Sequence, residues 1–168
     1  MNLYGLTNHL ISELRIKLIM DNDFNKLVYY KDDDSDIFSL PELENPFEQL
    51  NNQVFKNRRP KKVLDKQDVL VFIYLKRIKR DGYKTNKANT IWINVGLLVH
   101  ENCSKTLNGE REYSIISAIE KIAETSDFQS ALGKCSYEGS ELLNGIPFEW
   151  NGYVSTLRFD GFTERCLK

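Results

Sequence analysis

Few residues of this chain can support redox or metal chemistry. The 168 residues include only three cysteines, Cys103, Cys135 and Cys166, and two histidines, His9 and His100. The cysteines are widely spaced and form no C-x-x-C pair, which excludes a zinc ribbon and a thioredoxin-like motif. Three is also an odd number for a disulfide framework, so we expect reduced thiols in a protein that is assembled inside a cell.

The chain also lacks a long apolar run and a strong net charge. No stretch approaches the roughly 18 apolar residues needed to span a bilayer. The first 20 residues have no basic start, and charged residues interrupt their apolar ones, so we expect neither a secretory signal nor a membrane partner. The formal net charge of −1 argues against a protein whose main role is to coat nucleic acid, although it is compatible with a local basic patch.

The motifs of common enzymes are missing as well. The sequence contains no G-x-S-x-G elbow, no G-x-x-x-x-G-K-[ST] phosphate loop and no H-E-x-x-H helix. Cys103 and Ser104, close in sequence to His100, are the nearest approach to a nucleophile and its base, but no third group that would orient them can be identified. We therefore expect neither an enzyme nor a bound cofactor.

Apolar spacing predicts two main helices and a shorter one. Residues 6–19 carry apolar side chains at i, i+3 and i+4, which predicts a helix with one buried face and Thr7 as its N-cap. Residues 112–126 repeat this pattern with a single isoleucine-rich stripe. A short helix is predicted at residues 24–30, and one or two helical turns after Pro46, where proline suits the first helical position.

Two segments read as central strands. Residues 68–78 and 90–100 are rich in β-branched and aromatic residues and are apolar on both faces, so we expect helices or another subunit to cover them. Asp81-Gly82 is a turn signal between them and predicts an antiparallel hairpin. A loop is predicted at residues 104–111.

The last third of the chain completes the predicted sheet. Strand segments are expected at residues 134–138, 147–150 and 152–162, with Asn151-Gly152 either forming a tight turn or opening the last strand. The predicted fold class is α+β in a single domain: a small, mostly antiparallel sheet of about four strands packed by two main helices. A long irregular arm is predicted at residues 31–66.

The arm begins with an acidic run, because residues 32–36 hold four aspartates. A calcium loop needs oxygen ligands at alternate positions, which fit, but also a glycine at the sixth position and a glutamate at the twelfth. Ile37 and Leu43 occupy those two positions. Carboxylates crowded into one loop also repel each other and are better solvated than buried in a catalytic centre. A solvated acidic loop is therefore favoured over a metal or catalytic site.

Charge is segregated along the chain. Residues 32–55 carry seven acidic residues and no basic one, whereas basic residues dominate 56–66 and the expected hairpin 76–87. Acidic and basic segments of this kind can pair head to tail between identical subunits, and such heterologous contacts close into rings. The basic hairpin also leaves open a DNA-binding function.

Several short motifs resemble a known family. The segments KLVYYKDDD, LPELENPFEQLNNQVF, RRPKKVLDKQDVLVFIYL and GYVSTLRFDGF follow each other in the order seen in small neck proteins of tailed bacteriophages, of the tail-terminator or tail-completion type. The residues that carry the resemblance are Lys26, Leu27, Tyr29, Tyr30, Asn52, Phe55, Pro60, Gly152, Tyr153 and Phe159–Asp160.

The resemblance implies a virion structural protein rather than an enzyme, assembled in the host bacterial cytoplasm. Its expected partners are itself, in a ring of six or twelve copies, and other neck, portal or tail proteins, with non-specific contact to DNA in the channel. A tail terminator, a head-completion connector and a collar component all remain open.

The arm supplies the candidate contacts. The candidate oligomer contacts are Tyr30, Asp32, Asp34, Asp36, Phe38, Phe47, Phe55, Arg58 and Arg59, and the candidate basic contacts to DNA or a partner are Lys79, Arg80 and Lys84. The alternative is that the aromatic residues of the arm fold back over the core of their own domain.

Overall fold

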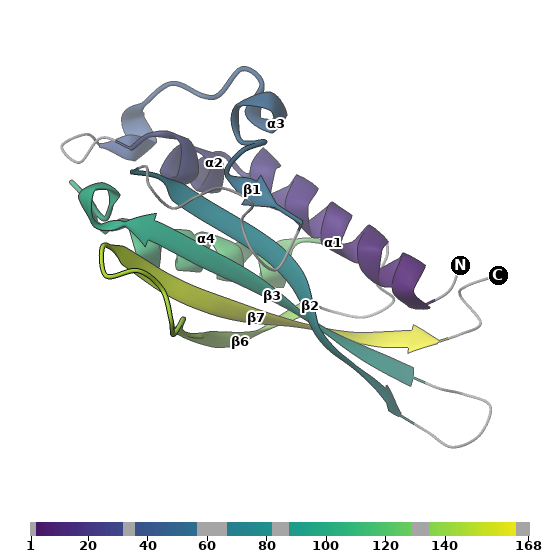
Figure 1. Ribbon diagram of the computed structural model, residues 1–168. Helices are drawn as coiled ribbons and strands as arrows, with labels where there is room; N and C mark the ends of the chain where they lie inside the picture. Colours follow the sequence, from purple (N-terminus) through teal and green to yellow (C-terminus); the bar gives the residue numbers. More distant parts are fainter. Residues whose placement is uncertain (1–2, 32–35, 57–66, 82–87, 129–134, 164–168) are drawn as a thin grey trace.

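A five-stranded sheet with helices on one face organises the fold (Figure 1). The computed structural model describes residues 3–31, 36–56, 67–81, 88–128 and 135–163. The helices are α1 (Leu3–Met20), α2 (Asn22–Tyr29), α3 (Pro46–Gln49) and α4 (Arg111–Thr125), with short 3-10 turns η1 (Ile37–Ser39) and η2 (Glu101–Cys103). The strands are β1 (Val54–Phe55), β2 (Val69–Asp81), β3 (Ala88–His100), β4 (Lys105–Thr106), β5 (Gly109–Glu110), β6 (Cys135–Leu142) and β7 (Trp150–Thr163).

The sheet runs in the order β1-β2-β3-β7-β6, and β4 and β5 form a separate small hairpin. All neighbouring pairs in the large sheet are antiparallel except β1 with β2. The predicted α+β class is therefore confirmed. The sheet has five strands rather than about four, because the two-residue β1 pairs with β2 within a segment predicted to be irregular.

The main core lies between α1, α2, α4 and one face of the sheet. Alternate residues of the central strands point into it, including Val71, Ile73 and Val95, each fully buried. The apolar stripe of α1 packs here through Leu10, Leu14 and Leu18, none of which has accessible surface. The burial of this stripe, rather than helix propensity alone, fixes an 18-residue helix against the sheet.

The opposite face of the sheet carries a smaller apolar cluster. It is formed by Leu70, Phe72, Leu98 and Trp150, with Phe55, Tyr74, Leu143 and Ile146 packed against them. Gly96 lies beside Phe72 in this layer, and a Cβ atom at Gly96 would overlap the Phe72 ring. The glycine is required for close packing, since the aromatic ring occupies the place of its missing side chain.

The predicted helices and hairpin are observed, with corrections at their boundaries. Thr7 lies inside α1, which begins at Leu3, so it is not the N-cap. The expected loop 104–111 contains the β4–β5 hairpin and the first residue of α4. Residues 147–149 are not a strand. Asn151-Gly152 is not a turn either, because both residues pair with β3 inside β7.

The described part of the predicted arm, residues 36–56, packs against its own domain. Ile37, Leu50 and Val54 are at most 1% exposed and belong to the main core. Arg15 of α1 ties the segment down, since its Nε donates to the carbonyl of Val54 at 2.9 Å. Partial burial of this guanidinium lowers the pKa of Arg15. Within the described residues, no helix is both long enough and apolar enough to cross a membrane.

Candidate functional site

The strand pairing gives the molecule two distinct ends. At one end the start of β2 and the start of β7 meet the end of β3, as the pairs Val69–Val99 and His100–Trp150 show. At the other end β2 and β3 extend together to the pair Asp81–Ala88. A 13-residue strand is about 40 Å long, so the two ends are well separated (Figure 1). We call the second one the hairpin end.

The first end carries exposed apolar and acidic side chains, and we call these residues the acidic end surface. Its members are Asp36, Phe38, Glu101, Leu107, Glu110, Tyr113, Glu141, Leu142, Phe148 and Glu149. The exposed fraction is 99% for Phe148, 68% for Leu142 and 67% for Leu107. The five carboxylates lie in segments 36–39, 101–110 and 141–149. The exposed basic residue in these segments is Lys105.

Hydrogen bonds and ring contacts join these segments into one surface. The amide Nδ2 of Asn108, at the tip of the β4–β5 hairpin, donates to Asp36 Oδ1 beside η1 at 2.9 Å. The backbone N–H of Glu101 donates to the carbonyl of Glu149 at 2.9 Å. The rings of Tyr113 and Tyr153 meet edge to face, with 5.9 Å between their centres. Leu142 pairs with Tyr153 across β6 and β7, which brings it to the same surface.

The contact between Tyr113 and Tyr153 raises the pKa of the Tyr153 hydroxyl. The hydroxyl of Tyr153 donates to the hydroxyl of Tyr113 at 3.4 Å. This hydrogen bond, followed by partial burial and nearby negative charge, raises the pKa of Tyr153 to about 12. Tyr153 is therefore a neutral phenol at physiological pH, suited to contact with an apolar or hydrogen-bonding partner.

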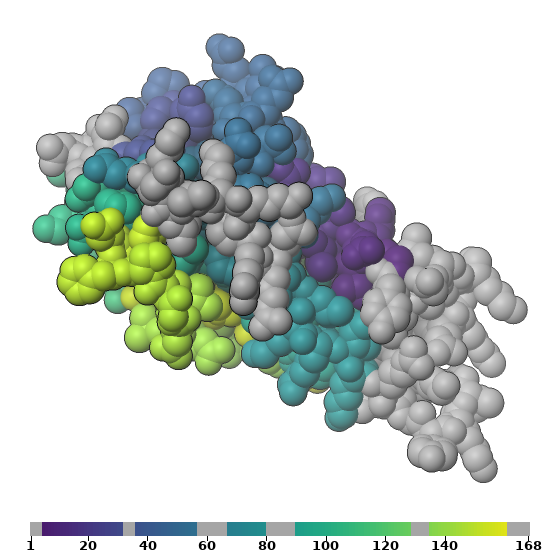
Figure 2. Space-filling view, in the orientation of Figure 1, coloured from purple at the N-terminus to yellow at the C-terminus, as the bar shows by residue number. Residues whose placement is uncertain are grey.

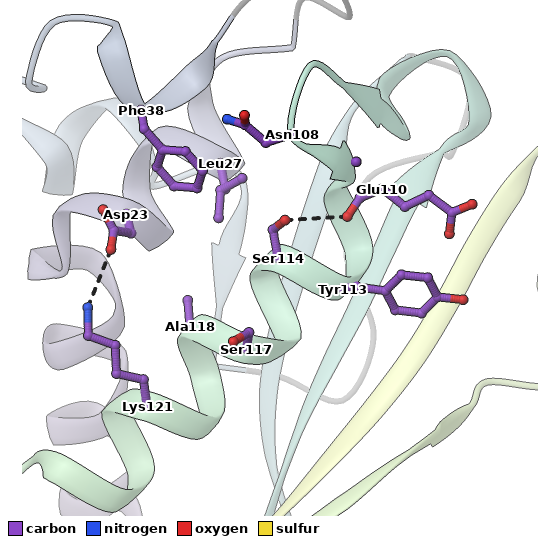
Figure 3. Close-up of a pocket in the computed structure, with 11 residues that line it drawn as sticks. Asp23, Leu27, Phe38, Asn108, Glu110, Tyr113, Ser114, Ser117, Ala118 and Lys121 are labelled. Atoms are coloured by element: carbon purple, nitrogen blue, oxygen red, sulfur yellow. Dashed lines mark hydrogen bonds and ion pairs between the residues drawn. The ribbon is translucent and has the colours of Figure 1, made fainter.

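A groove of about 550 Å³ opens on the acidic end surface between α2, η1, β5 and α4 (Figure 3). Phe38 and Leu27 line one side of it and the small residues Ser114, Ser117 and Ala118 of α4 line the other, while the Tyr113 ring points away from Phe38. Asp23, Asn108, Gly109, Glu110 and Lys121 complete the lining. Small side chains at i, i+3 and i+4 of a helix allow another segment to approach closely.

The charges of the groove are partly matched. The ammonium of Lys121 lies 3.3 Å from the carboxylate of Asp23, and both side chains are more than half exposed. Among the described residues no ion pair involves Glu110, although Lys105 stands opposite it in the β4–β5 hairpin. The Glu110 side chain is exposed and points away from Phe38 and Asp23 in Figure 3.

Arg111 connects α4 with α2 and η2 beside the groove. Its side chain has no accessible surface, which is rare for a charged residue. Nε donates to the carbonyl of Cys103, and Nη1 donates to the carbonyls of Tyr30 and of Leu27, the latter at 2.7 Å. The guanidinium thus connects the first turn of α4 with the end of α2 and with η2.

Glu112, beside Arg111, organises a second polar contact below the surface. Its carboxylate is 2% exposed and accepts hydrogen bonds from the hydroxyl of Ser104 at 2.7 Å and from Nδ2 of Asn151 at 2.6 Å. These bonds join η2, α4 and β7.

The residues that come nearest in sequence to a nucleophile and a base make structural contacts. The Ser104 hydroxyl donates to Glu112, and Cys103 is 2% exposed. Nδ1 of His100 accepts from the N–H of Asn102 at 3.2 Å, and its Nε2 lies 3.7 Å from Glu149. Within the described residues no group of histidine, cysteine, aspartate and glutamate is arranged to hold a metal ion.

The hairpin end carries basic groups on the sheet face opposite the helices. The guanidinium of Arg77 lies 4.0 Å from the centre of the Trp92 ring, and that of Arg158 lies 5.8 Å from it. Arg158 also pairs with Asp160 at 2.9 Å and with Glu138 at 3.9 Å. Lys76, Arg77 and Lys79 are exposed in this region, and Lys76 Nζ donates to Thr156 Oγ1 at 3.1 Å.

The predicted contact residues differ in their exposure and packing. Phe38 and Phe47 are 41% and 38% exposed, as a contact requires, and Asp36 is exposed on the acidic end surface. Tyr30 packs against the main core and donates its hydroxyl to the carbonyl of Pro41, while Phe55 packs in the smaller cluster. The predictions for Asp32, Asp34, Arg58, Arg59 and Lys84 lie outside the described residues, as does the side chain of Arg80.

Sequence reasoning missed most of the acidic end surface. Leu107, Leu142 and Phe148 come from two segments, 101–110 and 141–149, whose proximity depends on the strand register. One signal was available in the sequence. Tyr113 does not belong to the apolar stripe of α4, which predicts that its ring faces away from the core.

The comparisons with known proteins place the chain in a family. No curated protein matches it. The model of the YomW family matches residues 21–159, from the residue before α2 into β7, which is 139 of 168 residues. This match contains the groove and the whole acidic end surface. The chain therefore belongs to the YomW family, whose name is that of a Bacillus phage-like gene product, and it is a phage-associated protein.

Proposed function

We propose that this protein is a structural component of a tailed-phage virion. In this proposal it forms a homo-oligomeric ring in the neck, where it completes the tail or joins it to the head-portal assembly. The observation that carries the proposal is the acidic end surface, on which five large apolar side chains are exposed beside five carboxylates. Membership of a phage-associated family supports a function in a phage.

The cost of exposing these side chains supports a protein contact. Burial of one large apolar side chain contributes about 1.5–3 kcal/mol, and Phe148 is 99% exposed. Single exposed apolar residues need no explanation, but several at one end of a domain are typical of an interaction site. The aromatic residues Phe38, Tyr113 and Phe148 are also the residue types that contribute most at protein interfaces.

The chemistry of the groove supports binding rather than catalysis. Its charged lining residues are Asp23, Glu110 and Lys121, and two of these three already form an ion pair. A groove lined by Phe38, Leu27 and small α4 side chains fits a structural role.

The proposal is tested on phage particles. Mass spectrometry of purified virions is expected to detect the protein in a small, fixed copy number. A nonsense mutation in its gene is expected to yield DNA-filled heads and separate tails, which electron microscopy distinguishes from joined particles. Absence of the protein from virions, together with normal particles in the mutant, would overturn the proposal.

A DNA-binding accessory function is the second candidate, favoured by the exposed Lys76, Arg77 and Lys79 at the hairpin end. Two observations weaken it: Arg77 is already stacked on Trp92, and two carboxylates neutralise Arg158. If this function holds, DNA affinity falls as salt rises, with a slope of roughly −0.9 in a double-logarithmic plot for each phosphate contact. It also falls when Lys79 is replaced by alanine.

A further inference from the structure

The chain contains three Asn-Gly pairs, and the fold restrains them to different degrees. They are Asn108-Gly109, Asn144-Gly145 and Asn151-Gly152. In such a pair the backbone nitrogen of the glycine can attack the side-chain amide of the asparagine, because the glycine has no Cβ atom to hinder the approach. The attack also needs an asparagine side chain that is free to turn and a glycine N–H that no hydrogen bond engages. The contacts of each pair therefore decide how readily it reacts.

Asn151-Gly152 is the most restrained pair. Both residues lie inside β7 and pair with Val99 and Leu98 of β3. The side-chain Nδ2 of Asn151 donates to Glu112 Oε1 at 2.6 Å, and Gly152 is buried. The sheet and this side-chain bond hold the two reacting groups in place, so the pair reacts only when this part of the sheet opens.

Asn108-Gly109 is exposed but still held by hydrogen bonds. Asn108 lies in the turn of the β4–β5 hairpin, and its Nδ2 donates to Asp36 Oδ1 at 2.9 Å. Gly109 belongs to β5 and pairs with Thr106, whose hydroxyl donates to the Gly109 carbonyl at 2.8 Å. The pair reacts when this hairpin loosens, which costs less than opening the large sheet because β4 and β5 have only two residues each.

Asn144-Gly145 has neither kind of restraint. Both residues are exposed and lie between β6 and β7, outside the strands. In the described part of the chain, no hydrogen bond engages the Asn144 side chain or the N–H of Gly145. Gly145 has a φ of +76°, which glycine adopts readily, and a Cβ atom there would meet nothing within 4 Å. The two reacting groups are thus free to meet in the folded protein.

We propose that Asn144 is a self-modification site, at which the folded chain deamidates in water. The backbone nitrogen of Gly145 attacks Cγ of Asn144. The new C–N bond replaces the bond to the side-chain nitrogen, which leaves as ammonia together with the proton of the Gly145 N–H. Water then opens the cyclic imide at one carbonyl or the other. The first product is aspartate, and the second is isoaspartate, in which the main chain runs through the former side chain.

The two products differ in what they do to the loop. Leu143 and Ile146, on either side of the pair, pack against the smaller apolar cluster, and the N–H of Leu143 donates to the carbonyl of Gly152 at 2.9 Å. Aspartate adds only a carboxylate, in the segment that already carries Glu141 and Glu149. Isoaspartate also lengthens the main chain by a carbon atom between the two anchored side chains, and it therefore loosens their packing.

Peptide mapping of the full chain during incubation in mildly alkaline buffer tests the site. Mass spectrometry detects deamidation as the replacement of NH2 by OH. The tryptic peptide 135–158 contains both Asn144 and Asn151, so its fragment ions compare the two sites within one molecule. We expect Asn144 to react first, Asn108 more slowly, and Asn151 not at all while the sheet is folded. In urea the three rates should become similar, because the reacting groups are the same.

A second measurement tests the effect on the loop. Ion-exchange chromatography separates the deamidated chains, and Asn144→Asp is the matched control, with the added carboxylate but an unchanged main chain. We expect the isoaspartate fraction to have a lower thermal midpoint than Asn144→Asp, whose midpoint equals that of the wild type. Equal midpoints for the isoaspartate fraction and Asn144→Asp would overturn the predicted loosening.

Other results would overturn the modification site itself. Equal rates at Asn144 and Asn151 in the folded chain, or a faster reaction at Asn108, would show that the contacts described above do not control the reaction. A preference for Asn144 that persists unchanged in urea would show that the local sequence sets the order, and not the fold. The reaction belongs to the isolated chain, so none of these results bears on the proposed function in the phage neck.

Discussion

Replacing Arg111 by methionine tests how the groove is held together. The substitution keeps an unbranched side chain of similar length but removes the guanidinium, which has no accessible surface. Three buried or partly buried carbonyls, those of Leu27, Tyr30 and Cys103, lose a charged donor at once. Since these carbonyls belong to α2, η2 and the chain after α2, the change removes the contact that sets α4 against them.

The magnitude follows from the number of bonds. A hydrogen bond to a charged group contributes about 1.5–3 kcal/mol, and a buried acceptor that is left without a donor costs about 1–3 kcal/mol. With some relaxation of the loop end we expect a loss of about 3–5 kcal/mol in the free energy of unfolding. For a domain of this size, about 2–4 °C are lost per kcal/mol, which gives a decrease of about 6–20 °C in the thermal midpoint.

Urea unfolding followed by circular dichroism measures this loss. The matched control is Lys121→Met, which removes the same charge from the same helix at an exposed site with one surface ion pair. We expect that control to cost less than about 1 kcal/mol. Equal midpoints for the Arg111 and Lys121 variants would refute the reasoning, because they would show that the buried guanidinium contributes no more than an exposed ammonium.

Three further predictions concern the two packed layers and the groove rim. Gly96→Ala is expected to destabilise the fold by about 1–3 kcal/mol, since the added Cβ overlaps the Phe72 ring; combining it with Phe72→Leu should recover part of the loss in a double-mutant cycle of urea midpoints. Burial raises the pKa of Cys135 to about 12, from an ordinary value of 9.0. Between these values only the unfolded thiol loses its proton, so stability falls by up to about 1.4 kcal/mol per pH unit as pH rises above 9, and Cys135→Ala should make that slope shallower. Asp23→Asn, which breaks the exposed pair with Lys121, is expected to change the free energy of unfolding by less than about 1 kcal/mol; a larger loss in thermal denaturation would show that the pair is structural.

The parts of the fold that sequence predicted are those with one repeated physical signal. The i, i+3 and i+4 apolar spacing of α1 and α4 specifies a buried face without knowledge of what covers it. The β-branched residues of β2 and β3 specify strands apolar on both faces, and two apolar layers are observed. The two-residue strands β1, β4 and β5 were missed because they are too short to carry a period.

The errors came from residues whose role depends on distant neighbours. Asn151-Gly152 has the composition of a tight turn, but Gly152 faces Leu98 and Ile146, and a Cβ there would lie 2.9 Å from Ile146 Cδ1. The glycine serves a close approach within β7. Arg111 gave no signal of burial, because three carbonyls distant in sequence stabilise it.

The structure places the candidate contact surface differently from the sequence prediction. Segregated charge and exposed aromatic residues such as Phe38 indicated a contact surface on the acidic segment. Much of that segment instead packs against its own core, through residues such as Ile37 and Leu50. The surface that results combines Phe38 with Tyr113 and Phe148, which only the strand pairing and the helix docking bring to one end.

Hydroxyl-radical footprinting of purified virions tests the central claim most directly. Phe148 is 99% exposed and Tyr113 57% exposed in the isolated chain, and Met20 on α1, outside the acidic end surface, is 60% exposed. If the acidic end surface is a contact in the assembled neck, oxidation of Phe148 and Tyr113 is strongly reduced in virions relative to the isolated chain, while oxidation of Met20 is unchanged. Equal oxidation of Phe148 and Tyr113 in both states would contradict the account.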